Sequence, residues 1–190
     1  MSPALPLRPV PIASVPDDDL LPVFRAARDG DAQAFAELYR RFVRVVHGIL
    51  VARAGPEDAE DLTQEVFALV HRGLAGVREA GALPGWICTV ARNVATDHLR
   101  RRKRGTPLAE LTDVPAAPAT DGGRELKERV LARIRELPDA YRETLVMRLV
   151  EGLSGPEIAA RTGLTPGSVR VNLTRGMALL RPLLAQEGWP

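Results

Sequence analysis

Two helix-start signals lie close together near the C-terminal end of the chain. Ser154 and Glu157 have the spacing of a capping box, in which the serine hydroxyl and the glutamate carboxylate each accept a hydrogen bond from the other residue's backbone N–H. Gly163 then supplies the left-handed residue that commonly ends a helix. Thr165 and Pro166 start the next helix with a capping hydroxyl and a proline at the first helical position. The short turn predicts a helix-turn-helix.

The second of these helices has one apolar and one polar face. Its apolar residues recur at helical spacing, namely Val169, Leu173, Met177 and Leu180. The remaining positions carry groups that suit phosphates or base edges in a major groove, namely Ser168, Arg170, Asn172, Thr174 and Arg175. Four arginines and no acidic residue lie within 161–181, which favours DNA binding. A helical hairpin with a solvated polar face is the alternative.

Composition limits the class of protein. The 190 residues and 45% apolar content suffice for one domain or two small ones. The net charge is only +2, but acids gather at 57–65 and five consecutive bases occupy 100–104, which indicates two different partners. Cys88 is the only cysteine, so no intramolecular disulfide or zinc motif is expected and a reducing cytoplasm fits. No signal peptide or membrane-spanning run is present, and we expect no membrane insertion.

Helical periodicity, interrupted by proline and glycine, predicts an all-α fold with two small helical domains joined by a flexible linker. Asp31, Pro56, Pro84 and Pro138 are expected to begin helices. The linker contains acidic residues but no basic one, and could span about 60 Å if fully extended. The expected division is a disordered Pro-rich leader 1–18, a helical domain 19–104, the acidic linker 105–123, a helix-turn-helix domain 124–184 and a tail 185–190.

The helix expected after Pro56 carries an unusual set of acids. Asp58, Asp61 and Glu65 are three and four residues apart, so their like charges repel by a few tenths of a kcal/mol per pair. A helix that keeps such a face is suited to a basic partner. Favourable interaction with the helix dipole is the competing explanation, but it covers Asp58 better than Glu65, which lies beyond the first turn.

Several motifs in order resemble region 2 of bacterial RNA polymerase sigma factors of the extracytoplasmic-function (ECF) group. They are Asp61 to Phe67, Arg72-Gly73-Leu74, Leu83 to Ile87, Val90 to Asn93 and Asp97 to Arg101. The helix-turn-helix segment is similar to region 4 of the same group. The order, spacing and intervening linker match the two-domain pattern over about residues 20 to 184.

The resemblance implies a transcription initiation factor that binds core RNA polymerase, through the β′ coiled coil and the β flap, and directs it to promoters. It assigns polymerase binding to Asp61, Gln64 and Glu65. It assigns capture of the single-stranded −10 element to Trp86, Arg92, Asn93, Asp97, Arg100 and Arg101. It assigns reading of the double-stranded −35 element to Ser168, Arg170, Val171, Asn172, Thr174 and Arg175. Such a protein would be cytoplasmic and associated with the nucleoid when active.

Other functional classes would share part of this pattern. A dimeric operator-binding regulator would also carry a helix-turn-helix, and it predicts tight duplex binding without polymerase. An inactive sigma-like adaptor would keep the acidic helix and lose promoter capture. The three histidines share no close ligand spacing and no nucleophile or phosphate-loop motif occurs, so we expect no catalytic residue, metal or cofactor. The family resemblance also allows an anti-sigma factor as a partner, although no residue identifies one.

Overall fold

The computed structural model describes residues 20–105 and 122–185, with side chains from 20 to 102 and from 128 to 185. The regular structure within these ranges consists of eight α-helices and two 3-10 turns, which confirms the all-α prediction. The predicted leader, most of the predicted linker and nearly all of the predicted tail lie outside the described residues.

The first group of helices comprises α1 (Leu20–Arg28), α2 (Ala32–Arg53), α3 (Pro56–Gly73) and α4 (Leu83–Gly105), with 3-10 turns η1 (Leu74–Gly76) and η2 (Ala80–Ala82) between the last two. Asp31 caps α2 as predicted, since its carboxylate accepts hydrogen bonds from Gln33 N at 2.7 Å and Ala34 N at 3.1 Å. Gly55, with φ of +108°, turns the chain into α3, and Pro56 is the first residue of that helix.

The second group comprises α5 (Gly122–Arg135), α6 (Asp139–Leu149), α7 (Gly155–Thr162) and α8 (Pro166–Ala185). The capping box is present: Ser154 Oγ accepts from Glu157 N at 3.3 Å, and Glu157 Oε2 accepts from Ser154 N at 2.8 Å. Gly163 ends α7 with φ of +74°. The helix-turn-helix is therefore formed by α7 and α8. Helix α5 begins two residues before the predicted start at 124.

Helices α6 and α8 approach each other closely at Gly176. A Cβ atom at this position would lie 2.9 Å from Leu145 Cδ1 and 3.1 Å from Tyr141 Cβ. A side chain larger than hydrogen therefore requires the side chains of Leu145 and Tyr141 to shift. This contact between α6 and α8 fixes the position of the recognition helix relative to α6.

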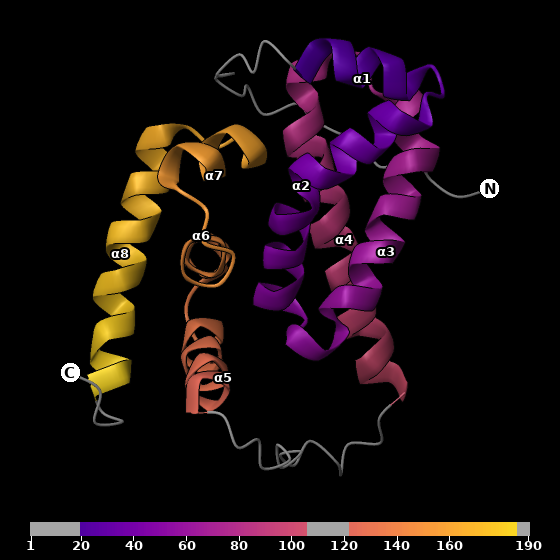
Figure 1. Ribbon diagram of the computed structural model, residues 1–190. Coiled ribbons are helices and arrows are strands. Elements are labelled where there is room, and N and C mark those ends of the chain that lie inside the picture. Colours follow the sequence, from indigo (N-terminus) through magenta and orange to yellow (C-terminus); the bar gives the residue numbers. More distant parts are fainter. Residues whose placement is uncertain (1–19, 106–121, 186–190) are drawn as a thin grey trace.

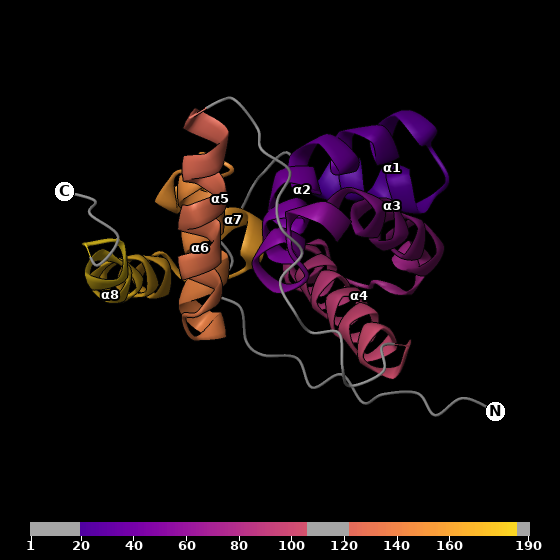
Figure 2. The same ribbon diagram turned by 90° about the horizontal axis from the view of Figure 1, so that it is seen from below.

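The two groups pack directly against each other. Helix α2 contacts α1, α3 and α4 of its own group, and also α5, α6 and α7 of the second group. Figures 1 and 2 show α5–α8 beside α2, with α8 on the outer side. The five consecutive residues 48–52 of α2 are all buried. Since five residues cover more than one full helical turn, α2 is enclosed on every side at this level.

The contact at Gly176 predicts that Gly176→Ala destabilises the protein by about 1–3 kcal/mol through overpacking against Leu145. Gly167→Ala is the matched control in the same helix, because a Cβ there would have only Thr165 Oγ1 within reach, at 3.8 Å. This control is expected to be neutral or to stabilise by up to about 1 kcal/mol. Urea unfolding of the full chain checks both values, and equal stability of the two variants would contradict the packing argument.

Candidate partner and nucleic-acid interfaces

The recognition helix α8 presents a continuous exposed face. Val169, Gly176 and Leu180 are buried against its own group. Five of the six residues predicted to contact the −35 element are exposed, namely Ser168, Arg170, Val171, Thr174 and Arg175. The sixth, Asn172, is half-buried at the edge of this face. The Ser168 hydroxyl also lies 2.9 Å from Thr165 Oγ1, so it belongs to the cap of the helix.

Helix α8 keeps this face clear of the first helical group. Within the described residues its element contacts are with α5, α6 and α7. Helix α7 differs, because it packs against both α2 and α4. The two helices of the helix-turn-helix therefore have different surroundings: α8 faces outward and α7 faces the other group.

The acidic face of α3 is divided into a paired and an unpaired part. Asp58 Oδ2 lies 3.1 Å from His98 Nε2 and 3.2 Å from Arg102 Nη1. Glu65 Oε2 lies 3.5 Å from Arg101 Nη2, with both side chains largely exposed. Residues of α4 thus pair with two of the stacked carboxylates of α3, those of Asp58 and Glu65.

Asp61 and Gln64 belong to the unpaired part. Both are exposed, and neither has a side-chain partner among the described residues. The opposite face of α3 is anchored in the core by Leu62, Val66 and Val70. Core packing therefore points Asp61 and Gln64 outward on a fixed helix.

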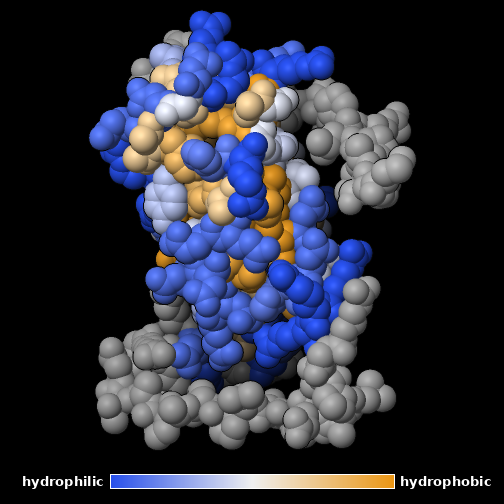
Figure 3. Space-filling view, turned by 90° about the vertical axis from the view of Figure 1, so that its right-hand side faces the viewer, coloured by the Kyte–Doolittle hydropathy of each residue, from blue (hydrophilic) through white to orange (hydrophobic). Residues whose placement is uncertain are grey.

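Helix α4 carries most of the predicted −10 residues on one stripe. Trp86, Asn93 and Asp97 follow one another at spacings of seven and four, which places them on the same helical face. Arg100 and Arg101 continue the stripe and are exposed. Gly73 makes room for the indole ring, since a Cβ there would lie 2.9 Å from Trp86 Cζ2. Figure 3 shows the face of the molecule that lies on the right-hand side of Figure 1, where apolar surface is bordered by hydrophilic residues.

Arg92 does not lie on this stripe. One residue before Asn93, it is turned by about 100° around the helix and meets Glu143 of α6. The contact is bidentate, with Arg92 Nη2 donating to Glu143 Oε2 at 2.8 Å and Arg92 Nε at 3.1 Å from both carboxylate oxygens. Burial lowers the pKa of Arg92, but hydrogen bonding and charge from Glu143 outweigh it, so the pKa is raised overall.

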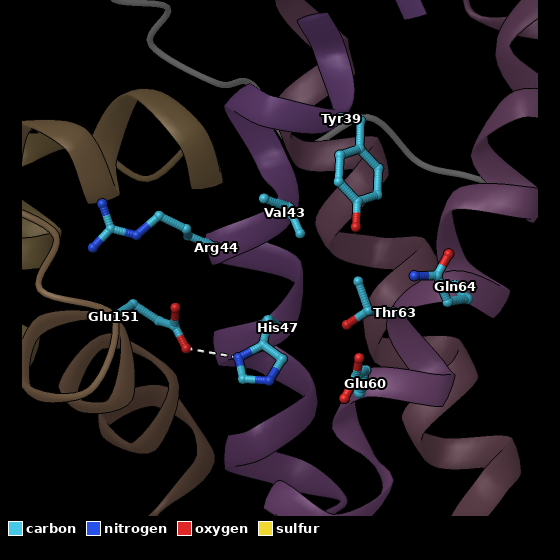
Figure 4. Close-up of a pocket in the computed structure, with 8 residues that line it drawn as sticks. All are labelled: Tyr39, Val43, Arg44, His47, Glu60, Thr63, Gln64 and Glu151. Atoms are coloured by element: carbon cyan, nitrogen blue, oxygen red, sulfur yellow. Dashed lines mark hydrogen bonds and ion pairs between the residues drawn. The ribbon is translucent and has the colours of Figure 1, made fainter. Parts of the chain in front are cut away.

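A groove lies between α2 and α3 and reaches the second helical group (Figure 4). It has a volume of about 290 Å³. It is lined by Tyr39, Val43, Arg44, His47, Glu60, Thr63, Gln64 and Glu151. His47 Nδ1 lies 2.8 Å from Glu151 Oε1, and this pair bridges the two groups at one end of the groove.

Sequence reasoning did not identify the residues that join the two groups. The bridging side chains are His47, Arg53, Cys88, Arg92, Asp139, Glu143 and Glu151. A signal was present in α2, where the apolar stretch 48–52 is buried at five consecutive positions. The segment 143–147 of α6 is also buried at five consecutive positions, although it includes the polar residues Glu143 and Thr144. A helix that is apolar all round is enclosed on all sides, and a helix at the surface of a separate domain keeps a polar face.

Comparison with known proteins agrees with the geometry. The family model for sigma-70 region 2 matches residues 38–105, and that for sigma-70 region 4 matches residues 127–180. RNA polymerase sigma factor CarQ of Myxococcus xanthus is 35% identical over 164 residues, which cover 84% of this chain and 94% of CarQ. The chain belongs to the ECF group of RNA polymerase sigma factors. Sigma factors bind core RNA polymerase and promoter DNA, so this one is a promoter-directing initiation factor, and an operator-binding regulator is not favoured.

Two further similarities extend along most of the chain. ECF RNA polymerase sigma factor SigE of Mycolicibacterium smegmatis is 34% identical over 174 residues, covering 87% of this chain and 67% of SigE. A solved structure of CnrH in complex with the cytosolic domain of CnrY shares the fold, with a TM-score of 0.59, 23% identity, and coverage of 90% of this chain and 99% of CnrH. Across residues 20–105 and 122–185, no helix combines the length and apolar character needed to cross a bilayer.

The capping box of this sigma factor generates a pH prediction. The backbone hydrogen bond from Ser154, followed by its hydroxyl, lowers the pKa of Glu157 below the usual 4.5. A depressed carboxylate pKa stabilises the folded state above the unfolded-state pKa, and this stabilisation is lost as the pH falls through the folded-state value. Compared with Glu157→Gln, which keeps the capping geometry, the wild type should be more stable by about 0.3–1 kcal/mol at pH 7.

The measurement is the thermal unfolding midpoint of both proteins between pH 7 and pH 3. The difference should shrink as the pH falls below 4.5. A difference that stays constant across this range would show that the charge of Glu157 does not contribute.

Proposed function

We propose that α3 is the surface by which this sigma factor docks on the β′ coiled coil of core polymerase, through Asp61, Gln64 and Glu65. The observation that carries the proposal is the exposure of Asp61 and Gln64 without side-chain partners in the described part of the chain. Glu65 has only a long, exposed ion pair with Arg101, at 3.5 Å. Such surface pairs contribute little and exchange readily for a partner's cation.

The α4 stripe is proposed to capture the melted −10 strand. Trp86 offers an aromatic surface for stacking, Asn93 and Asp97 offer polar groups for a flipped base, and Arg100 and Arg101 offer charge to the backbone. Support comes from their common face and from the exposure of the four polar members. Arg92 was assigned to the same function, and it can reach DNA only after it leaves Glu143.

The exposed face of α8 is proposed to read the −35 element in the major groove, with the second helical group also contacting the β flap. Arg170 and Arg175 supply phosphate or guanine contacts, while Val171 and Thr174 can meet thymine methyl groups. The outward position of α8 supports this assignment. Asn172, at the edge of the face, makes the smaller contribution.

The remaining parts of the proposal concern chemistry and location. The protein catalyses no reaction itself and acts as a specificity subunit of polymerase. It acts in the cytoplasm, and at the nucleoid when bound to promoters, because its two partners are there. Restraint by an anti-sigma factor stays a prediction of the family resemblance.

The docking surface is tested by Asp61→Arg in a run-off assay with purified core polymerase and genomic promoter fragments. Reversing an exposed charge at the centre of the contact should lower core affinity by at least about tenfold, since like charges facing each other across an interface cost several kcal/mol. Asp29→Arg, beyond the C-terminal end of α1, is the charge-matched control and should behave as the wild type. Wild-type transcription by Asp61→Arg would refute the assignment of α3.

The −35 assignment is tested by Arg175→Ala in the reconstituted holoenzyme. Removing a phosphate contact should weaken promoter binding and reduce the slope of log affinity against log salt by about 1, whereas loss of a base contact should cost about 1–3 kcal/mol at one promoter position. Arg25→Ala, on the exposed surface of α1, controls for net charge. An unchanged affinity and salt slope for Arg175→Ala would exclude this face of α8.

A further inference from the structure

We propose that Asp58 of α3 is a positioning residue for the α4 stripe, because it anchors the part of α4 that extends beyond the hydrophobic core. The anchor holds Asp97, Arg100 and Arg101 in one place relative to the helix that is proposed to dock on polymerase. The proposal rests on the proposed function for the roles of α3 and α4. The anchoring contact itself belongs to the isolated chain, and it can be measured without polymerase or DNA.

The C-terminal part of α4 extends beyond the hydrophobic core. The last buried residue among the described side chains of this helix is Ala95, and the helix continues to Gly105. This continuation corresponds to about 15 Å of helix. Figure 1 shows it reaching past the turn between α2 and α3. Apolar burial therefore positions the first half of α4, but not the half that carries Arg100 and Arg101.

The buried face of α4 continues beyond the core with polar residues. Residues at spacings of four, three and four lie on one side of the helix, namely Ala91, Ala95, His98 and Arg102. Both alanines are buried. Asp97, next to His98, is turned by about 100° and belongs to the α4 stripe. The side of α4 that the core holds as far as Ala95 is therefore held by charged side chains farther on.

Asp58 is the common partner of these charged side chains. Its Oδ2 lies 3.1 Å from His98 Nε2 and 3.2 Å from Arg102 Nη1. Because the two partners are four residues apart on α4, one carboxylate holds a full helical turn. The side chains of His98 and Asp58 are only 21% and 33% exposed, so water screens this pair less than it screens an ordinary surface ion pair.

The start of α3 holds Asp58 in place. The residue belongs to the first turn of α3, after Pro56 and Glu57, where the positive end of the helix dipole favours a carboxylate. Ala59 and Leu62, which follow it in the helix, are buried in the core. The first turn of α3 is therefore a fixed support for the end of α4.

Glu65 makes a second contact with the same end of α4, but it is not suited to be the lasting anchor. Its Oε2 lies 3.5 Å from Arg101 Nη2, and both side chains are largely exposed. Glu65 is also part of the surface proposed to dock on polymerase, and Arg101 is part of the α4 stripe. Both are engaged by other partners in the proposed complex, whereas Asp58 belongs to neither set and keeps its contact.

The five consecutive bases at 100–104 explain why this end of α4 requires an anchor. Like charges three or four residues apart on a helix repel each other, and their favourable position at the C-terminal end of the helix dipole offsets this only in part. A frayed end would keep its cations near DNA, but out of register with Trp86 and Asn93. Asp58 offsets part of the repulsion and fixes that register.

Amide hydrogen exchange in the isolated full-length protein tests the anchor. Asp58→Asn keeps the size of the side chain and removes its charge, and His98→Ala removes the other half of the contact with a strong helix former. Each should speed exchange at 96–102 by at least about threefold, because local opening controls exchange there. Exchange in the buried segment 48–52 of α2 should keep its wild-type rate.

Glu57→Gln is the matched control for exchange. It removes a charge from the same turn of α3, and Glu57 has no side-chain partner in the described part of the chain. It should leave exchange at 96–102 unchanged. Wild-type exchange there in both Asp58→Asn and His98→Ala would refute the anchor. Faster exchange throughout the protein would show a general loss of stability and would also overturn it.

Holoenzyme reconstituted with each variant tests the positioning role. The probe is the labelled non-template strand of a promoter fragment that the wild-type holoenzyme transcribes, and its affinity is read by fluorescence anisotropy. Asp58→Asn and His98→Ala should each weaken strand binding by about three- to fivefold, the size expected for the loss of a partly exposed ion pair. Affinity for core polymerase should stay at the wild-type value.

The sign of the change separates positioning from simple electrostatics. Removing a negative charge strengthens attraction to nucleic acid, so Glu57→Gln should bind the strand at least as tightly as the wild type. Asp58→Asn carries the same change of charge and should bind it more weakly, whereas Asp58→Glu keeps the carboxylate and should recover most of the affinity. Tighter strand binding by Asp58→Asn would refute the positioning role.

Two further outcomes separate this proposal from the proposed function. If Asp58→Asn weakens core binding as much as strand binding, Asp58 is a docking residue and the positioning role is refuted. Wild-type strand binding by Asn93→Ala would instead refute the assignment of α4 to the −10 element. The exchange rates at 96–102 would still decide the anchor in that case, because they do not depend on DNA.

Discussion

The arrangement of the molecule depends on the burial of α2 on every side. Its residues 48–52 contact the first helical group on one side and α6 on the other, and α6 has a matching stretch at 143–147. Neither group could leave the other without exposing apolar surface. The hydrophobic effect therefore favours contact, but it is non-directional and does not define how α6 is placed along α2.

The charged side chains define how α6 is placed along α2. A buried ion pair gives little net stability, because desolvation offsets most of the attraction, whereas removing one partner leaves an uncompensated charge at a cost of about 3–5 kcal/mol. Glu143 thus selects one register, in which Arg53 and Arg92 both reach it. Arg92 remains partly exposed, with a side-chain exposure of 34%, so water reaches one side of this ion pair.

The sequence predicted the local structure well because its signals are short-range. Asp31 and Ser154 cap helices through residues two or three positions away, and Gly163 and Pro56 act on their own turns. The family resemblance indicated the function, and the motifs that carry it are also short segments of the chain. The contact between the two groups was missed because Glu143 lies 51 residues from Arg92 and 90 from Arg53, beyond the range of any local signal. The sequence did indicate that Arg92 lies off the α4 stripe, because adjacent residues of a helix are turned by about 100° from each other and Asn93 lies on the stripe.

The two surfaces proposed to read DNA differ in how far the other helical group covers them. The α8 face is clear of the first helical group, whereas α4 gives one of its arginines to Glu143 and α7 is covered. A protein with both surfaces free would bind nucleic acid by its charge alone, independently of polymerase. Pairing Arg92 with an acid of the other group lowers the positive charge that α4 presents to nucleic acid.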